Sequence, residues 1–194
     1  MCSSDLSDTG RAILLKLGCA AREAELAAIA GYLHDLGNLV NRENHALTGS
    51  AMARDILQAM GMPAAEVADV VAAIGHHQEE NGEPMSDISA ALILADKIDV
   101  HRGRVRKSNQ MDFDTHDRVN YSAERSVVRV SRTRRTIRYD LTIDTRLSKV
   151  MEYFEIFMSR MIIARKAAAF LDCTLELVIN RSEERRVGKE CRSR

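Results

Sequence analysis

Apolar residues recur every three or four positions through the first hundred residues, which is the spacing of amphipathic helices. Glycines end most of these segments, and Ser86 is a residue type that caps helix N-termini. The pattern predicts five helices, over residues 11–17, 20–35, 46–60, 67–75 and 86–96. The last one is apolar on nearly every side, so we expect it to lie at the centre of a bundle.

The pattern changes after residue 106. Residues 107–116 are polar and loop-like, and alternation at every second position then replaces the helical spacing. It predicts two strands, a long amphipathic helix and a last strand, over residues 128–130, 137–143, 146–171 and 175–179. We therefore expect a mainly α protein, with a helical domain over 7–106 and a small α+β unit of β-β-α-β order over 117–180.

Composition narrows the function classes. The chain has 194 residues, 28 basic and 28 acidic, and is 45% hydrophobic, which indicates a globular protein. A net charge of zero argues against binding to a nucleic acid polymer or an anionic membrane. No run of 18 apolar residues exists and the cysteines lack CxxC spacing, so we expect a soluble, cytoplasmic protein without a zinc ribbon or a disulfide framework.

The residues that could carry chemistry are imidazoles and carboxylates at helix ends or within apolar faces. They are His34, Asp35, His45, His76, His77 and Asp96. Asp96 follows Leu92 by four positions and Ile88 by eight, so its carboxylate projects from a buried face. Because a buried carboxylate is costly alone, Asp96 needs a cation, a proton or strong donors. The position of Asp35 is also unfavourable for a carboxylate, because the C-terminus of a helix disfavours negative charge.

Together these side chains form a donor set for divalent metal. Imidazole nitrogen and carboxylate oxygen suit Mn, Fe, Zn or Co, and a carboxylate can also bridge two ions. Two ions about 3.5–4 Å apart can activate water and stabilise a phosphoryl oxygen. We therefore expect one or two divalent ions, held by residues from several helix ends.

Four sequence blocks carry a resemblance to a known family: AGYLHDLGN, NHALTGSAMARDIL, AAIGHHQEENGEP and ALILADKID, in this order. They resemble the HD superfamily of metal-dependent phosphohydrolases, and their spacing is similar to that of its two-metal members. The resemblance covers residues 10–106 and implies an HD-type helical bundle. It also implies the metal ligands His34, Asp35, His45, His76, His77 and Asp96, with His77 a better match than His76.

The resemblance implies hydrolysis of a phosphate ester, a nucleotide or a related small molecule, by water that the metal activates. Asp35 is then a catalytic residue that bridges the ions. Lys97 is a second candidate catalytic residue, which would contact phosphate oxygens. The alternative for Lys97 is a solvated helix end, where a cation suits the helix dipole.

The chain departs from the superfamily pattern because no histidine lies between residues 7 and 33, where a preceding helix supplies one. The end segments MCSSDL and RSEERRVGKECRSR resemble translated sequencing adapters, so we interpret 1–6 and 181–194 as non-native ends and the missing ligand as lying upstream. The alternative is a catalytically inactive HD module that binds a nucleotide or a protein partner. A third hypothesis is oxidative chemistry at a di-iron site.

The predicted C-terminal helix carries an apolar stripe that is rich in methionine. Its members are Leu147, Val150, Met151, Phe154, Phe157, Met158, Met161 and Ile162. A stripe of this kind is buried either within the chain or in a homodimer.

Overall fold

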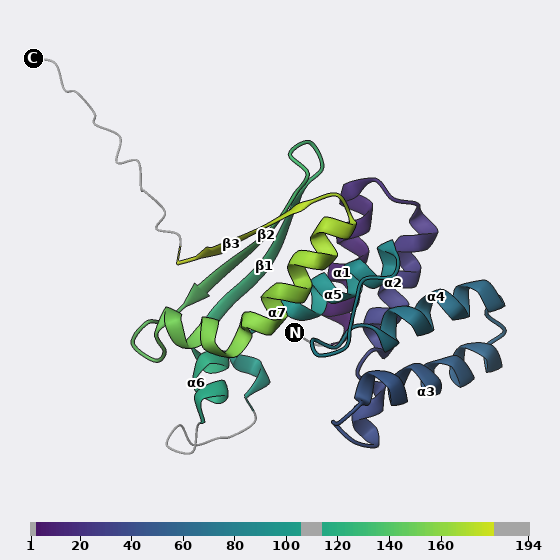
Figure 1. Ribbon diagram of the computed structural model, residues 1–194, viewed down its shortest axis with the longest axis horizontal. Coiled ribbons are helices and arrows are strands. Elements are labelled where there is room, and N and C mark those ends of the chain that lie inside the picture. Colours follow the sequence, from purple (N-terminus) through teal and green to yellow (C-terminus); the bar gives the residue numbers. More distant parts are fainter. Residues whose placement is uncertain (1–2, 106–113, 181–194) are drawn as a thin grey trace, which may run out of the picture.

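A computed structural model of the chain describes residues 3–105 and 114–180 (Figure 1). The five predicted helices are present in its N-terminal half, and the first begins well before the predicted residue 11. They are α1 (Ser3–Leu17), α2 (Ala21–Leu33), α3 (His45–Ala59), α4 (Ala64–Gly75) and α5 (Asp87–Lys97). Two short 3-10 turns, η1 (Leu36–Leu39) and η2 (Arg102–Arg104), follow α2 and α5.

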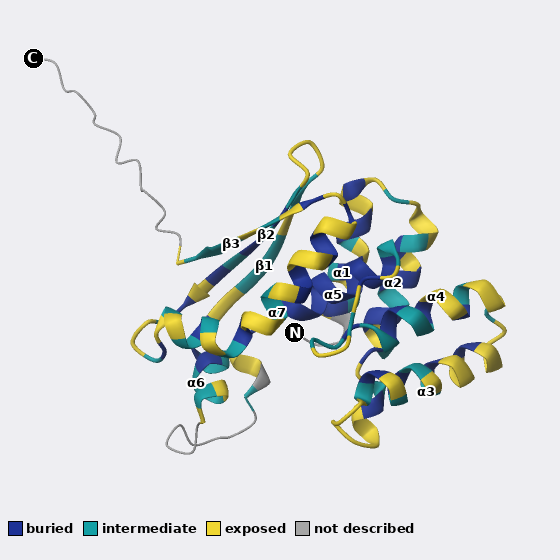
Figure 2. Ribbon diagram, viewed as in Figure 1, coloured by how far each residue is buried: buried dark blue, intermediate teal, exposed yellow. Residues whose placement is uncertain are grey.

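Helix α5 is the centre of the molecule, as its apolar composition predicts. Every residue from Ile88 to Lys97 is buried, and Figure 2 shows the helix almost wholly in the colour of buried residues. The Ser86 hydroxyl caps it by accepting a hydrogen bond from the Ser89 N–H at 3.2 Å. Helices α1, α2, α4 and α7 all pack against α5, so the residues at its C-terminal end lie in the interior.

The C-terminal unit contains α6 (Thr115–Ser122), β1 (Ala123–Ser131), β2 (Thr136–Ile143), α7 (Val150–Phe170) and β3 (Thr174–Ile179). Strands β1 and β2 form an antiparallel pair, and β3 adds to β2 in parallel after the α7 crossover. Strand β2 buries alternate residues, which confirms the predicted alternation. The chain is thus mainly α with a small three-stranded sheet.

Helix α6 was not predicted, because residues 107–116 were expected to be loop. Residues 107–113 of that stretch lie outside the described residues, whereas His116 lies in α6. The Asp114 side chain accepts from the Asp117 N–H at 2.8 Å, and the Asp117 side chain accepts from the Asp114 N–H at 3.3 Å. This capping box is a helix-start signal that was available in the sequence.

The predicted apolar stripe of α7 is buried only in part: Phe157 is buried, and Phe154 and Met161 pack against the core. Met151, Met158 and Ile162 are exposed, while alanines 164, 167 and 168 are buried. Helix α7 packs against α5, and small buried side chains allow close helix packing, which hydrophobicity alone does not indicate. The Tyr139 hydroxyl also donates to the Leu94 carbonyl at 2.7 Å, so sheet and bundle share one core. Among the helices of the described ranges, none is long and apolar enough to cross a bilayer.

Candidate metal centre

Five of the candidate metal ligands come together from the ends of four separate helices. His34 and Asp35 follow α2, His45 begins α3, His77 follows α4, and Asp96 lies in the last turn of α5. The Nε2 atom of His34 lies 3.5 Å from Asp35 Oδ2 and 3.9 Å from Asp96 Oδ1. His34, Asp35 and His77 each offer a ligand atom within 4.8 Å of the others.

Three of the imidazoles are oriented in the same way. In each, Nδ1 lies within hydrogen-bond distance of the carbonyl three residues upstream: His34 to Gly31 at 2.8 Å, His45 to Arg42 at 2.9 Å, and His77 to Ile74 at 2.6 Å. Because a carbonyl only accepts, each Nδ1 must carry the proton. Each neutral ring then presents the bare lone pair of Nε2, as metal-binding histidines do.

The atoms that face one another in the cluster are therefore mostly acceptors. Nε2 of His45 lies 3.2 Å from Nε2 of His77 and 3.5 Å from Asp35 Oδ1. Lone pairs and carboxylate oxygens at such distances repel one another unless a proton or a metal ion lies between them. The donor set of nitrogen and oxygen fits a borderline divalent metal.

Burial and charge hold two of these residues in the protonation states that bind metal. Burial lowers the pKa of His77 to about 4, so the ring is neutral at neutral pH. Burial alone would raise the pKa of Asp96, but Lys97 and Arg160 hold it well below its usual value. A neutral imidazole and an ionised carboxylate are ready to coordinate a metal without first losing protons.

A close backbone approach places Asp35 beside His45. A Cβ at Gly37 would overlap the His45 carbonyl oxygen and lie 2.7 Å from the Gly49 nitrogen. Only glycine therefore lets the η1 turn pack against the first turn of α3. The sequence pattern indicated Gly37 only as a helix stop, and this packing role could not be recognised from it.

Lys97 is buried rather than solvated, which makes the alternative of a solvated helix end wrong. Its side chain is 2% exposed, and its ammonium group pairs with Asp96 and lies 3.1 Å from Glu79 Oε1. Glu79 was not among the predicted residues, although it lies in the HHQEENGEP block. The catalytic role of Lys97 stays a prediction.

Arg160 of α7 is the main site residue that sequence analysis missed. Its Nη2 donates to the Asp96 carbonyl at 2.6 Å and lies 3.6 Å from Asp96 Oδ1, while Nε lies 3.4 Å from Glu79 Oε1. A weak signal was available, because Arg160 interrupts the apolar face between Phe157 and Ala164.

The cluster opens into a polar cavity of about 690 Å³ between the bundle and the C-terminal unit. Residues on both sides line it, among them Asp35, His45, His77, Asp96, Lys97, His116, Asn120, Phe157 and Arg160. His76 is half-buried, and among the described residues none of the hydrogen bonds or ring contacts that join His34, His45 and His77 includes it. Its assignment as a ligand stays a prediction.

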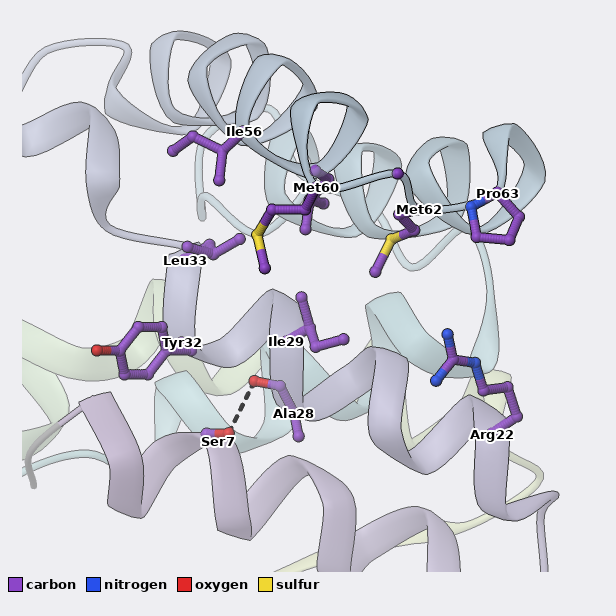
Figure 3. Close-up of a pocket in the computed structure, with 12 residues that line it drawn as sticks. Ser7, Arg22, Ala28, Ile29, Tyr32, Leu33, Ile56, Met60, Met62 and Pro63 are labelled. Atoms are coloured by element: carbon purple, nitrogen blue, oxygen red, sulfur yellow. Dashed lines mark hydrogen bonds between the residues drawn. The ribbon is translucent and has the colours of Figure 1, made fainter.

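A second cavity, of about 680 Å³, lies between α2 and the α3–α4 connection (Figure 3). Its wall is mostly apolar, and Ile29, Met60 and Met62 project into it. The charged residue in that wall, Arg22, donates to Glu66 at 2.7 Å. The wall of this cavity offers no set of donors for a metal, so the candidate metal ligands are those of the polar cavity.

Two comparisons bear on this site. The family model of the HD domain matches residues 7–101, which span α1 to α5 and carry the whole cluster. No curated protein matches the chain. Helices α6 and α7, which complete the cavity, lie beyond the matched segment.

Proposed function

Because residues 7–101 form an HD domain, of the metal-dependent phosphohydrolase type, we propose that this protein hydrolyses a phosphate ester in the polar cavity. The observation that carries the proposal is the convergence of three Nε2 atoms and two carboxylates. Nε2 of His34 faces Asp35 and Asp96, Nε2 of His45 faces Asp35, and Nε2 of His77 faces Nε2 of His45. This arrangement is unfavourable unless a proton or a metal ion lies among the acceptors, and its donor atoms fit a divalent metal such as Mn, Fe, Zn or Co.

The cluster suggests which residues would hold the metal. His34, His77 and Asp96 would bind it from the bundle interior. Asp35 directs one oxygen toward His34 and the other toward His45, which supports a bridging role between two ions. When bound, a divalent metal lowers the pKa of water and stabilises charge on a phosphoryl oxygen.

The cavity wall favours a small phosphate-bearing substrate such as a nucleotide. A volume of about 690 Å³ is in the usual range of small-molecule sites. Arg42, Lys97 and Arg160 contribute cations to the wall, but more numerous acids share it. A phosphate ester therefore requires a metal to offset the negative charge of the wall, which agrees with metal dependence.

The test is metal content and turnover in an Asp35→Asn variant. Purified protein is analysed by elemental mass spectrometry and assayed with p-nitrophenyl phosphate and bis(p-nitrophenyl) phosphate in the presence of Mn²⁺. We expect the parent protein to bind metal and turn over at least one ester, and Asp35→Asn to lose most of both.

The matched control is Asp69→Asn, which removes an exposed carboxylate on α4 and should leave both properties unchanged. An Asp35→Asn variant that keeps its metal and its turnover would overturn the proposal. Metal binding by the parent protein without turnover of either ester would support the alternative, an HD module that binds its ligand without cleaving it.

A further inference from the structure

The last turn of α5, which carries Asp96, is held by a side chain from outside the HD domain. We propose that Arg160 of α7 is a positioning residue for the metal centre, because it fixes the Asp96 backbone and thereby the direction of the Asp96 carboxylate. This inference rests on the proposed function only in requiring that the cluster binds a metal.

The first support is the hydrogen bond from Arg160 to the backbone. Carbonyls in the last turn of a helix lack partners within the helix, and basic side chains can satisfy them. The Asp96 carbonyl accepts from Arg160 Nη2 at 2.6 Å and from the Asp99 N–H at 3.1 Å. Arg160 thus tethers the turn that carries a predicted metal ligand.

The second support is the way Arg160 itself is held. Its guanidinium carbon lies 5.3 Å from the centre of the Phe157 ring, and its Nε lies 3.4 Å from Glu79 Oε1. The side chain is only 15% exposed. A planar guanidinium fixed on several sides loses little further freedom when it bonds, so it can define the position of its partner.

The third support is that the two carboxylate oxygens of Asp96 face different partners. Lys97 pairs with Oδ2, which leaves Oδ1 facing Nε2 of His34 at 3.9 Å. Arg160 lies 3.6 Å from Oδ1 while it bonds the backbone of the same residue. The two cations therefore hold Asp96 with one oxygen directed into the cluster. The C-terminal unit is then part of the metal centre as well as a wall of the cavity.

The test separates the orientation that Arg160 imposes from the charge that it carries. Mn²⁺ is titrated into the metal-free full chain by calorimetry, and the Tm of each metal-free protein is measured. Arg160→Lys keeps the positive charge, but a single ammonium cannot reproduce the fork between Asp96 and Glu79. Arg160→Met removes both properties. Arg165→Met, an exposed residue of the same helix, is the matched control.

We expect Arg160→Lys to weaken Mn²⁺ binding by about 10- to 100-fold, which is the usual effect of removing an outer partner of a metal ligand. Arg165→Met should bind as the parent protein does. Parental affinity in Arg160→Lys overturns the proposal, whatever its Tm, because a purely structural role would lower the Tm alone. A second result would also overturn the proposal, namely that Arg160→Met binds Mn²⁺ more tightly than the parent protein while Arg160→Lys binds it equally well. That result would show that only the positive charge of Arg160 affects the metal.

Failure of this inference is distinct from failure of the proposed function. If the parent protein binds no Mn²⁺, Zn²⁺ or Fe²⁺, the metal centre itself is refuted. If the parent protein binds metal and Arg160→Lys binds it equally well, only the positioning role is refuted. Arg160→Lys retains the charge and most of the bulk of the side chain, so the comparison does not depend on whether Arg160→Met folds.

Discussion

The Nε2 atoms of His45 and His77 lie 3.2 Å apart, although 32 positions separate the residues in the chain. Each ring has committed its Nδ1 proton to a backbone carbonyl, so both Nε2 atoms are acceptors when the rings are neutral. While both rings are neutral, two lone pairs at this distance destabilise the protein unless a metal ion binds between them or beside them. The cluster therefore predicts that metal and folding are coupled.

Metal should stabilise the folded protein. When the free metal concentration is 100 times the Kd, binding contributes about 2.7 kcal/mol to the free energy of unfolding. For a chain of this length we expect a rise in Tm of about 5–10 °C on adding Mn²⁺ or Zn²⁺ to chelator-treated protein. Differential scanning calorimetry measures the rise directly.

Two histidine variants test whether the rise in Tm on adding metal comes from binding at this cluster. His77→Asn keeps a donor for the Ile74 carbonyl but removes Nε2, so the rise should be lost. His76→Asn changes the neighbouring imidazole, which the structure leaves outside the cluster, and the rise should remain. Loss of the rise in His76→Asn would restore His76 to the set of ligands.

The sequence predicted the parts of the site that depend on local spacing. Helical periodicity and capping residues placed His34, Asp35, His77 and Asp96 at helix ends and indicated the buried face of α5, while the resemblance to the HD superfamily implied the set of ligands. These patterns are local, so they can be recognised without knowledge of the tertiary fold. The buried carboxylate of Asp96 also required a cation, a proton or strong donors, and the structure supplies a cation in Lys97.

The parts that were missed depend on contacts between distant segments. Arg160 reaches Asp96 across 64 positions, and periodicity cannot pair a helix of the C-terminal unit with the end of α5. The packing of Gly37 on α3 is also tertiary, since it requires the path of two backbones. On α7 the pattern favoured large apolar residues, whereas the structure also buries alanines 164, 167 and 168 and leaves Met151 and Met158 exposed.

Lys97 should contribute to stability as well as to the site. Its ammonium group pairs with Asp96 and Glu79 in the interior, so Lys97→Met leaves two carboxylates with less compensation. Breaking a buried ion pair from one side costs about 3–5 kcal/mol, and we expect a loss near the lower value because Arg160 remains. Urea denaturation of the metal-free protein measures the loss.

Lys166→Met, which removes an exposed cation of α7, is the control and should leave stability unchanged. Parental stability in Lys97→Met, together with a raised KM for a phosphate ester, would contradict the pairing role. It would instead favour direct contact between Lys97 and the substrate.

Gly37→Ala should disrupt the metal centre more than the small size of the added methyl group suggests. The added methyl group would overlap the His45 carbonyl oxygen, so the η1 turn must move away from α3 and carry Asp35 with it. We expect metal affinity to fall by at least about tenfold, since small displacements of a ligand shell have effects of this size. Calorimetric titration with Mn²⁺ measures the fall.

Gly10→Ala is the matched control for this substitution. A Cβ at Gly10, inside α1, would meet its nearest neighbour at 3.7 Å, which is ordinary contact. Alanine there should keep the parental affinity and raise helix stability slightly. Equal affinities in Gly37→Ala and Gly10→Ala would show that the turn moves without displacing Asp35.

Acid should destabilise the metal-free protein through His77. Burial lowers the pKa of this ring to about 4 in the folded state, from 6.5 when it is exposed. Between these values the unfolded chain binds a proton that the folded chain excludes, so the free energy of unfolding falls as pH falls from about 6.5 to 4. The expected loss is about 2–3 kcal/mol between pH 7 and pH 4.5. Asp96 remains ionised over this window, because its pKa is held well below its usual value.

Urea denaturation at the two pH values, with a chelator present, measures this loss. His77→Asn removes the titrating ring while keeping a donor for the Ile74 carbonyl, so its stability should depend less steeply on pH across the same window. His101→Asn is the control, because His101 lies after α5 and outside the cluster, and it should keep the parental pH dependence. If His77→Asn instead loses as much stability on acidification as the parent protein does, protonation of His77 is not the cause of the loss. The ring would then be able to accept a proton within the folded protein.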